Sequence, residues 1–256
     1  MGKRVLIIGD SIIDKSVNLQ ALGLSLESPT LKTSFMHESR HYGGAANVAK
    51  FAALFGLEVT FATCMSESSE KAFIKNNDLK LINFNNKIEN IKTRFYVNHG
   101  NATYKHLQIN EINKKSFYFD LPADFMSEYD IIALSDYRCG VVSQQLVSNS
   151  VKSAALTFGA SQISTHPSNF EMFQQMDYLV CNKAEATSFE RRENVLITDG
   201  ANGCMFNEKH YPAPAVKNPA NIIGAGDCFY AAILAFGDPL LANQKAAAYV
   251  SGDLKC

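Results

Sequence analysis

The order of hydrophobic and polar positions along the chain predicts strands that alternate with helices. Apolar runs at 4–10, 131–134 and 178–181 each lead into a polar residue, which is typical of buried parallel strands with ligands at their carboxyl ends. Small and apolar residues dominate 43–56 and the stretch from Gly226 onward, and both patterns predict helices. Further strands are expected at 58–64, 79–84, 155–158 and 195–197, with a helix at 143–152. This alternation predicts an α/β fold built on a mostly parallel sheet.

Two segments depart from the alternation. Residues 15–40 are more polar and less periodic, with one candidate strand at 31–36, and are expected to form an excursion from the core. Strands are predicted at 92–99 and 103–109, joined by a turn at Gly100-Asn101. Because the chain has no internal repeat, low-complexity tract or clear linker, we expect residues 1–256 to form a single domain.

Composition and charge narrow the class of partner. Hydrophobic residues make up 46% of the chain and charged residues 19%, which is typical of a globular protein. The formal net charge of -1 gives no electrostatic case for nucleic acid or an anionic membrane, and the apolar runs are too short for a membrane span. The N-terminus lacks the pattern of a signal peptide. The six cysteines are irregularly spaced without a CxxC pair, so reduced thiols and a cytoplasmic location are expected.

The strongest candidate for chemistry is Gly224-Ala225-Gly226-Asp227, which leads into the last predicted helix. The glycines let a ligand approach backbone N–H groups at the positive end of a helix. A carboxylate in the first turn can accept a proton from an attacking hydroxyl. Alternatively, Asp227 only complements the helix dipole and the glycines only form a tight turn. From these residues alone both interpretations remain open.

Several motifs in order along the chain resemble those of ribokinase/PfkB-type carbohydrate kinases. They are Asp10 and Asp14, Gly43-Gly44-Ala45-Ala46-Asn47, Asn182-Lys183-Ala184-Glu185, Ile197-Thr198-Asp199-Gly200-Ala201-Asn202-Gly203 and Gly224-Ala225-Gly226-Asp227. Within the family, segments 9–14, 27–29, 43–49 and 134–137 are similar to the heptose-7-phosphate kinase domain. The resemblance implies a ribokinase-like fold with helices on both faces of the sheet. It also implies a small β lid, built from about 15–40 and 92–109, that closes over the sugar.

The resemblance also implies roles for individual residues. Asp227 would be the catalytic base, and the N–H groups of Gly224, Ala225 and Gly226 would hold the transferred phosphoryl group. The sugar or sugar phosphate would bind to Asp10, Asp14, Gly43, Gly44 and Asn47, joined by Asp136. ATP would bind beside Asn182, Glu185, Thr198, Gly200 and Gly203, with Glu185 contacting Mg²⁺ through water. A lid sheet of this kind often pairs with a second subunit, so a homodimer is implied.

Simpler structural roles exist for some of these residues. Asn182 and Glu185 have the spacing of a capping box, in which each side chain binds the other residue's backbone N–H. Asn47 stands where a helix begins, and asparagine favours helix starts even where it binds no ligand. Asp10 ends a predicted strand.

The nucleotide side departs from the family pattern. Asn221, Ile222 and Ile223 stand where the family usually has an acid and hydroxyl residues, and that acid often helps to hold a monovalent cation. The connection at 186–194 is short and the chain ends at Cys256, so we expect a reduced wall around the adenine. The resemblance as a whole implies transfer of the ATP γ-phosphoryl group to a hydroxyl of a sugar or sugar phosphate. The alternative is a catalytically weak or inactive kinase-like protein that binds a sugar or nucleotide.

Overall fold

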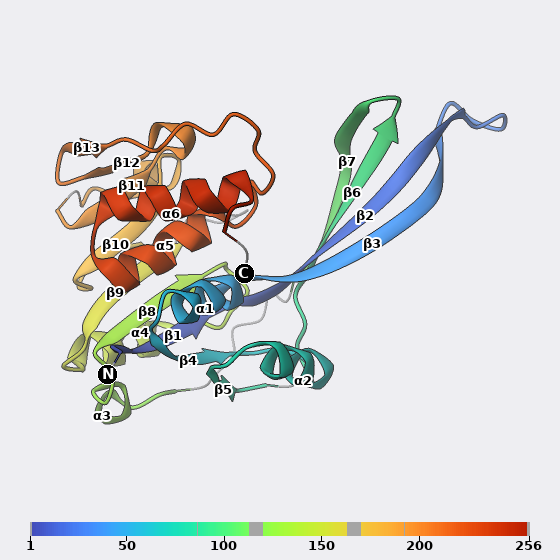
Figure 1. Cartoon of the computed structure of the whole chain (residues 1–256). Coiled ribbons are helices and arrows are strands. Elements are labelled where there is room, and N and C mark those ends of the chain that lie inside the picture. The colour runs from blue at the N-terminus through green and yellow to red at the C-terminus, as the bar shows by residue number, and fades with distance from the viewer. Residues whose placement is uncertain (1, 86, 113–119, 163–169, 192, 255–256) are drawn as a thin grey trace.

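A computed structural model describes residues 2–85, 87–112, 120–162, 170–191 and 193–254 (Figure 1). Its larger sheet has the strand order β13-β12-β11-β10-β9-β8-β1-β4-β5. The strands are β1 (Arg4–Gly9), β4 (Glu58–Thr63), β5 (Lys80–Asn83), β8 (Ile131–Asp136), β9 (Leu156–Ser161), β10 (Tyr178–Asn182), β11 (Val195–Thr198), β12 (Cys204–Phe206) and β13 (Lys209–Tyr211). Neighbours from β5 to β11 pair in parallel, and only β12 and β13 add antiparallel pairs. The predicted α/β class with a mostly parallel sheet is confirmed.

Helices cover both faces of this sheet (Figure 1). One face carries α1 (Ala45–Leu54), α2 (Glu67–Asn76), α5 (Ala225–Phe236) and α6 (Pro239–Ser251), and the other carries α3 (Ala123–Met126) and α4 (Gln144–Lys152). Side chains alternate along β1, so that Val5 and Ile7 pack into the first core and Leu6 and Ile8 into the second. Short 3₁₀ helices, η1 (Glu185–Ser188) and η2 (Gly200–Asn202), follow β10 and β11.

Side chains at the helix starts explain why several helices begin where they do. Ser66 and Ser143 each accept a hydrogen bond from a backbone N–H three residues later, which caps α2 and α4. Asp238 caps α6 in the same way, and proline occupies the first turn. The sequence patterns did not indicate α2, because its apolar face buries little beyond Phe73.

A second sheet projects from the body as an arm (Figure 1). It has the order β3-β2-β6-β7, from β2 (Ser11–Leu24), β3 (Leu31–Gly44), β6 (Ile91–His99) and β7 (Ala102–Glu111). The expected pair at 92–99 and 103–109 is present. By contrast, the single strand expected at 31–36 is part of a 14-residue strand that pairs with a second strand of the same length. Pairing between strands, rather than burial in a core, holds these polar segments extended.

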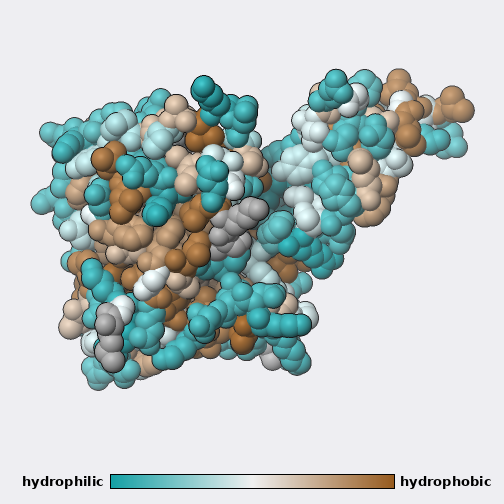
Figure 2. All heavy atoms as spheres, viewed as in Figure 1, coloured by the Kyte–Doolittle hydropathy of each residue, from teal (hydrophilic) through white to brown (hydrophobic). Residues whose placement is uncertain are grey.

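The two faces of the arm differ in polarity. The register places Val17, Phe95 and Leu107 on one face, and Asp14, Lys92 and Arg94 on the other. Exposed leucines, including Leu24 and Leu26, lie toward the outer end of the arm, where Figure 2 shows hydrophobic atoms at the surface.

Two further features bear on the class of protein. Within the described part of the chain, Cys64, Cys139, Cys181, Cys204 and Cys228 are buried and unbridged. No helix among the described residues is both long enough and apolar enough to cross a membrane.

Candidate active site

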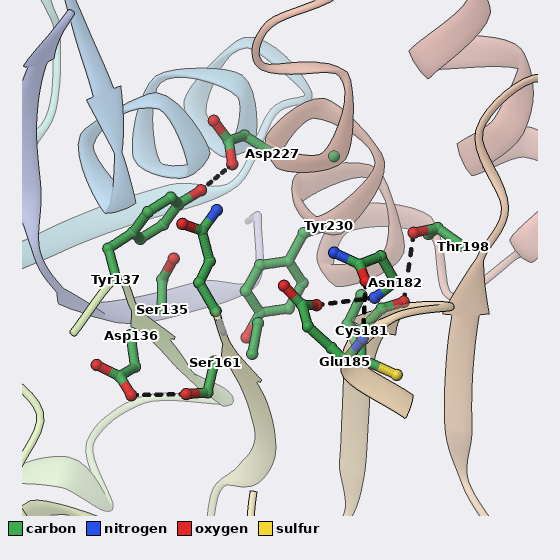
Figure 3. Close-up of a pocket in the computed structure, with 14 residues that line it drawn as sticks. Ser135, Asp136, Tyr137, Ser161, Cys181, Asn182, Glu185, Thr198, Asp227 and Tyr230 are labelled. Carbon is green, nitrogen blue, oxygen red and sulfur yellow. Dashed lines mark hydrogen bonds between the residues drawn. The ribbon is translucent and has the colours of Figure 1, made fainter. Parts of the chain in front are cut away.

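A pocket of about 120 Å³ lies where the carboxyl ends of β8, β9, β10 and β11 meet the start of α5 (Figure 3). Ligands gather at this edge of parallel α/β sheets. Its lining includes Ser135, Asp136, Tyr137, Ser161, Asn182, Glu185, Thr198, Gly226, Asp227 and Tyr230. The strand ends and the helix N-terminus thus bring acids, hydroxyls and an amide around one small volume.

Asp227 lies in the first turn of α5, and both of its carboxylate oxygens are bound. Oδ1 accepts a hydrogen bond from the Tyr137 hydroxyl, and Oδ2 accepts one from Asn47 Nδ2 at 3.0 Å. Burial raises the pKa of Asp227 from 3.8 to about 6, although these two hydrogen bonds oppose the rise. A carboxyl group with this pKa is ionised at neutral pH and can still accept a proton.

The structure explains the two glycines before Asp227 in different ways. Gly224 has a φ of 95°, and a Cβ there would lie 2.6 Å from Asn47 Nδ2. Gly226 has no heavy atom within 4 Å of an ideal Cβ, so nothing in the protein requires its missing side chain. The space above Gly226 is therefore open to a ligand.

The start of α5 offers backbone donors to that space. Among the described residues, the N–H groups of Gly224 and Gly226 have no protein acceptor, and that of Ala225 donates to the Ile222 carbonyl at 3.4 Å. Free N–H groups and the helix dipole together favour an anion here.

Asp10 and Asp136 are both buried and support the loop after β8. The Asp10 carboxylate accepts hydrogen bonds from the N–H groups of Tyr137, Cys139 and Val141, at 2.8 to 3.1 Å. Burial, and then the charge of Asp136, raise the pKa of Asp10 to about 6. Asp136 accepts from the Ser161 hydroxyl at 2.7 Å and from the Arg138 N–H at 2.9 Å. Asp136 lines the pocket, whereas Asp10 lies behind it.

Asp14, Gly43 and Gly44 lie where the arm joins the body. Asp14 forms an ion pair with Arg94 of the neighbouring strand β6. A Cβ at Gly43 would lie 2.3 Å from Asp14 Oδ2, and one at Gly44 would lie 2.5 Å from the Asp10 carbonyl oxygen. Both glycines let β2 and β3 pack closely at the base of the arm.

Asn182 and Glu185 form the reciprocal capping box that their spacing predicts. The Asn182 N–H donates to Glu185 Oε2 at 2.8 Å, and the Glu185 N–H donates to Asn182 Oδ1 at 2.9 Å (Figure 3). Asn182 Nδ2 and Glu185 Oε1 take no part in the box. The capping role is therefore confirmed, and both residues line the pocket.

A second pocket of about 340 Å³ adjoins the first and shares Thr198 and Gly226 with it. Most of its lining is apolar or glycine, and includes Gly200, Ala201, Gly203, Val216, Ile222, Phe229, Ala246, Ala247 and Val250. Thr198, Gly200 and Gly203 thus come together as the sequence predicts. Helix α6 forms one wall of this pocket. Its size and apolar lining suit a flat heterocyclic base.

No cluster of three or more His, Cys, Asp or Glu side chains that could hold a metal ion occurs in the described ranges. A Mg²⁺ ion carried by nucleotide phosphates needs only one or two protein carboxylates, because it keeps several waters. Glu185 lines the smaller pocket and fits that requirement.

Sequence reasoning assigned no role to three residues that the structure places near Asp227 or near its neighbour Asp14. Tyr137 donates to its carboxylate, and the Lys92 Nζ lies 5.6 Å from the centroid of the Tyr137 ring. Arg94 binds Asp14. Tyr137 is adjacent to Asp136 in a recognised segment, but no sequence signal distinguishes Lys92 or Arg94, since only strand pairing brings them to the site.

This combination of a parallel sheet, a β arm and a Gly-Ala-Gly-Asp helix start defines a class of phosphoryl-transfer protein. The chain belongs to the pfkB family of carbohydrate kinases, which it matches over residues 3–238. It is 24% identical to the bifunctional protein HldE of Campylobacter jejuni, with 97% of this chain aligned. The chain spans about 61% of that relative's length.

Solved structures with the same fold include two ribokinases. That of Thermotoga maritima superposes with a TM-score of 0.68 at 18% identity, covering 98% of this chain and 93% of its own. That of Arabidopsis thaliana, complexed with ribose and ATP, gives a TM-score of 0.67 at 15% identity, covering 98% and 92%. These similarities confirm the ribokinase-like fold.

Proposed function

We propose that this protein is an ATP-dependent sugar kinase in which Asp227 is the catalytic base. The observation that carries the proposal is the place of Asp227, at the start of α5 between the arm and the two adjoining pockets. The base takes a proton from the acceptor hydroxyl, and the hydroxyl oxygen attacks the γ-phosphorus of ATP. The bond from that phosphorus to the β,γ-bridging oxygen breaks and ADP leaves.

The nucleotide lies along both pockets in this proposal. The apolar pocket takes the adenine, beside Gly200 and Gly203, and the phosphates pass Thr198 toward Gly226. The free N–H groups of Gly224 and Gly226 stabilise charge on the transferred phosphoryl group, with Ala225 contributing its dipole. Mg²⁺, when bound, neutralises the phosphates and would be held through water by Glu185, with Asn182 beside it.

The acceptor lies between Asp227 and the polar face of the arm. Asn47 and Asp14 supply an amide and a carboxylate for hydroxyl groups, while Gly43 and Gly44 keep the base of the arm close. Asp136 borders the pocket, and Asp10 acts by holding the loop that carries Tyr137. The arm serves as the lid that excludes water when the sugar is bound.

A sugar phosphate, most like heptose 7-phosphate, is the proposed acceptor. The sequence resemblance to heptose-7-phosphate kinase domains and the HldE relatives support this choice. Lys92 and Arg94 lie on the polar face of the arm and suit an anionic acceptor. A small, polar metabolite of this kind fits the cytoplasmic location that the sequence predicts.

The competing function is sugar or nucleotide binding without turnover. Ile222 is 71% exposed and Ile223 49% exposed, so the positions that usually carry hydroxyl groups present hydrocarbon beside the phosphate path. Such a surface weakens phosphate binding, because it offers no hydrogen bonds to replace those of water.

A screen for ligands that raise the melting temperature, followed by an assay of ADP release, separates the two functions. A bound ligand stabilises the folded state whether or not it reacts. The kinase proposal expects stabilisation by ATP with Mg²⁺ and by a sugar phosphate, with ADP released only when both are present. Stabilisation by both without ADP release would support the binding function instead.

A homodimer through the lid completes the proposal. The apolar face of the arm exposes Phe35, Leu107 and Ile109, which a second copy of the same face would bury. Sedimentation of the wild type should give a dimer, and Leu107→Glu should give a monomer. Gln108→Glu adds the same charge on the opposite face and should leave the dimer intact. A monomeric wild type would contradict this part of the proposal.

A further inference from the structure

Tyr137 is held through its backbone and through its side chain. Its backbone N–H donates to the buried Asp10 carboxylate at 2.8 Å, and its hydroxyl donates to Asp227 Oδ1. The aromatic ring lies under the Lys92 ammonium group of the arm, 5.6 Å from the ring centroid. Tyr137 therefore connects the sheet end, the arm and the candidate base.

The Tyr137 hydroxyl and Asn47 Nδ2 both donate hydrogen bonds to the Asp227 carboxylate. Each donor binds a different oxygen, and the two come from the loop after β8 and from α1. Two donors on separate elements fix the plane of the carboxylate relative to α5. Since each carboxylate oxygen has two lone pairs, an acceptor hydroxyl can still bind beside either donor.

The charged groups around this pair act in opposite directions. Asp14 raises the pKa of Asp227, whereas Lys92 lowers it. Burial, the charge of Asp227, and more weakly Asp14 and Glu185, raise the pKa of Tyr137 well above 10. The phenol therefore stays protonated and donates at every pH where the protein works, and a donor to the ionised carboxylate opposes the effect of burial.

We propose that Tyr137 is a positioning residue for the catalytic base: its hydroxyl orients the Asp227 carboxylate and keeps it ready to accept the sugar proton. This inference rests on the proposed function of Asp227. Lys92 strengthens the arrangement from the arm, through its charge and its contact with the ring. The base is thus tuned by a residue whose side chain ends at Asp227 rather than at the nucleotide.

The first test compares the pH dependence of kcat/KM in the wild type and Tyr137→Phe. Loss of the donor should raise the pKa that sets the acid limb of the profile by about one unit. A hydrogen bond to a charged group stabilises the charged form by at least the free energy that corresponds to such a shift. The ratio of wild-type to variant kcat/KM should then be roughly tenfold larger at about pH 5 than at about pH 8. Tyr129→Phe, which removes a hydroxyl near Phe125 and α3, should leave the profile unchanged.

The second test does not need turnover. The carboxyl carbon of Asp227, assigned with Asp227→Asn, is titrated by carbon-13 NMR in the unliganded protein. Tyr137→Phe should raise its midpoint. Difluorotyrosine at position 137, a stronger donor of nearly the same shape, should lower it. The fluorinated protein keeps the ring and its contacts, so it decides the question even where Tyr137→Phe fails to fold.

The outcomes separate this inference from the proposed function. Equal Asp227 midpoints in the wild type and the fluorinated protein would overturn the role of Tyr137, whatever the activity. An active Asp227→Asn protein would overturn the assignment of the base, while the titration would still report whether Tyr137 controls that carboxyl group. Opposite shifts in the two Tyr137 proteins, together with an inactive Asp227→Asn protein, are the expected result.

Discussion

Asn47 and Asp227 are 180 positions apart in the chain, yet Asn47 Nδ2 lies 3.0 Å from Asp227 Oδ2. The contact forms because α1 and α5 pack against each other on the same face of the sheet, with their N-termini at the same edge. Neither helix has a side-chain cap, because the N-cap residue of each is a glycine, Gly44 for α1 and Gly224 for α5. Two helix starts without side-chain caps therefore meet at one carboxylate, and at α5 the N–H groups of Gly224 and Gly226 are available for a ligand.

Replacing Asp227 by Asn tests the catalytic base. The amide keeps the size and can still bond to Asn47 and Tyr137, but it cannot accept the proton. We expect kcat to fall by about 10²–10⁴-fold with sugar and ATP affinities largely kept. Steady-state kinetics and calorimetric titration measure the two effects, with the exposed Asp124→Asn as a control. Turnover at the wild-type rate would show that Asp227 is not the base.

The same variant should change how stability depends on pH. Burial raises the pKa of Asp227 from 3.8 to about 6, so between these values the folded protein binds a proton that the unfolded chain has released. The contribution of Asp227 to the wild-type free energy of unfolding therefore falls as pH rises through this range. Asp227→Asn lacks this term and should gain on the order of 1 kcal/mol relative to the wild type from about pH 4 to about pH 7, since Asp227 is only half-buried.

Urea denaturation of both proteins at several pH values measures that difference. Asp10 has a similarly raised pKa, but it is present in both proteins and cancels in the comparison. A difference in stability that does not change with pH would mean that the Asp227 carboxyl group has an ordinary pKa.

The two glycines at the start of α5 should respond differently to alanine. Gly226→Ala meets no atom within 4 Å and keeps helical backbone angles, so the protein should fold with unchanged stability. Its methyl group enters the proposed phosphoryl position, and kcat/KM should fall on the order of 10²-fold. Gly224→Ala combines a positive φ with a contact of 2.6 Å to Asn47, so it should lose stability as well.

Thermal denaturation measures the stability of both alanine variants, and steady-state kinetics measures their activity. Each variant serves as the control for the other. Full activity in Gly226→Ala would place the transferred phosphoryl group elsewhere.

Much of the body could be predicted from the sequence because its signals are local. Runs such as Val5–Ile8 are apolar on every position, since both faces of a parallel strand are covered. The arm was harder, because β2 and β3 are held by pairing with each other, and their polar face carries no periodic signal of a core. Their full lengths become apparent only when the partner strand is known.

The residues of the candidate site also fall into those marked by a local motif and those brought together only by the fold. Asp227 and the glycines before it stand in one short motif, so the sequence alone marks them. The resemblance assigns Asp10 to the sugar, and the structure adds that its carboxylate accepts three backbone hydrogen bonds from a loop 127 to 131 residues away. Contacts of that separation, like those of Lys92 and Arg94, follow from topology and cannot be inferred from spacing.

Replacing Asp14 tests the proposed binding site for the sugar. Its ion pair with Arg94 lies on the polar face of the arm, and both side chains are largely buried. Asp14→Ala removes a partner for sugar hydroxyls and leaves Arg94 unpaired, so sugar affinity should fall by roughly 5- to 150-fold with ATP affinity unchanged. Lys15→Ala is a matched control, because Lys15 lies next to Asp14 on the opposite face and pairs with Glu38. Equal loss of both affinities in Asp14→Ala would indicate misfolding rather than a lost sugar contact.

Asn221 predicts how the protein responds to monovalent cations. Its Nδ2 donates to the Tyr249 carbonyl at 3.2 Å and its backbone N–H to the Val250 carbonyl at 3.1 Å, so this residue ties the α5 entry to the end of α6. The neutral amide brings no negative charge to the position where many relatives carry an acid, and Ile222 and Ile223 add no side-chain oxygen. A weakly hydrated cation needs several oxygens to replace its water, whereas Mg²⁺ travels with the nucleotide phosphates. Activity should therefore require Mg²⁺ and change less than about twofold when K⁺ is exchanged for Na⁺ or choline at constant ionic strength, in keeping with ordinary screening. Strong, saturable activation by K⁺ in the same assay would mean that backbone carbonyls near Asn221 form a cation site without the acid.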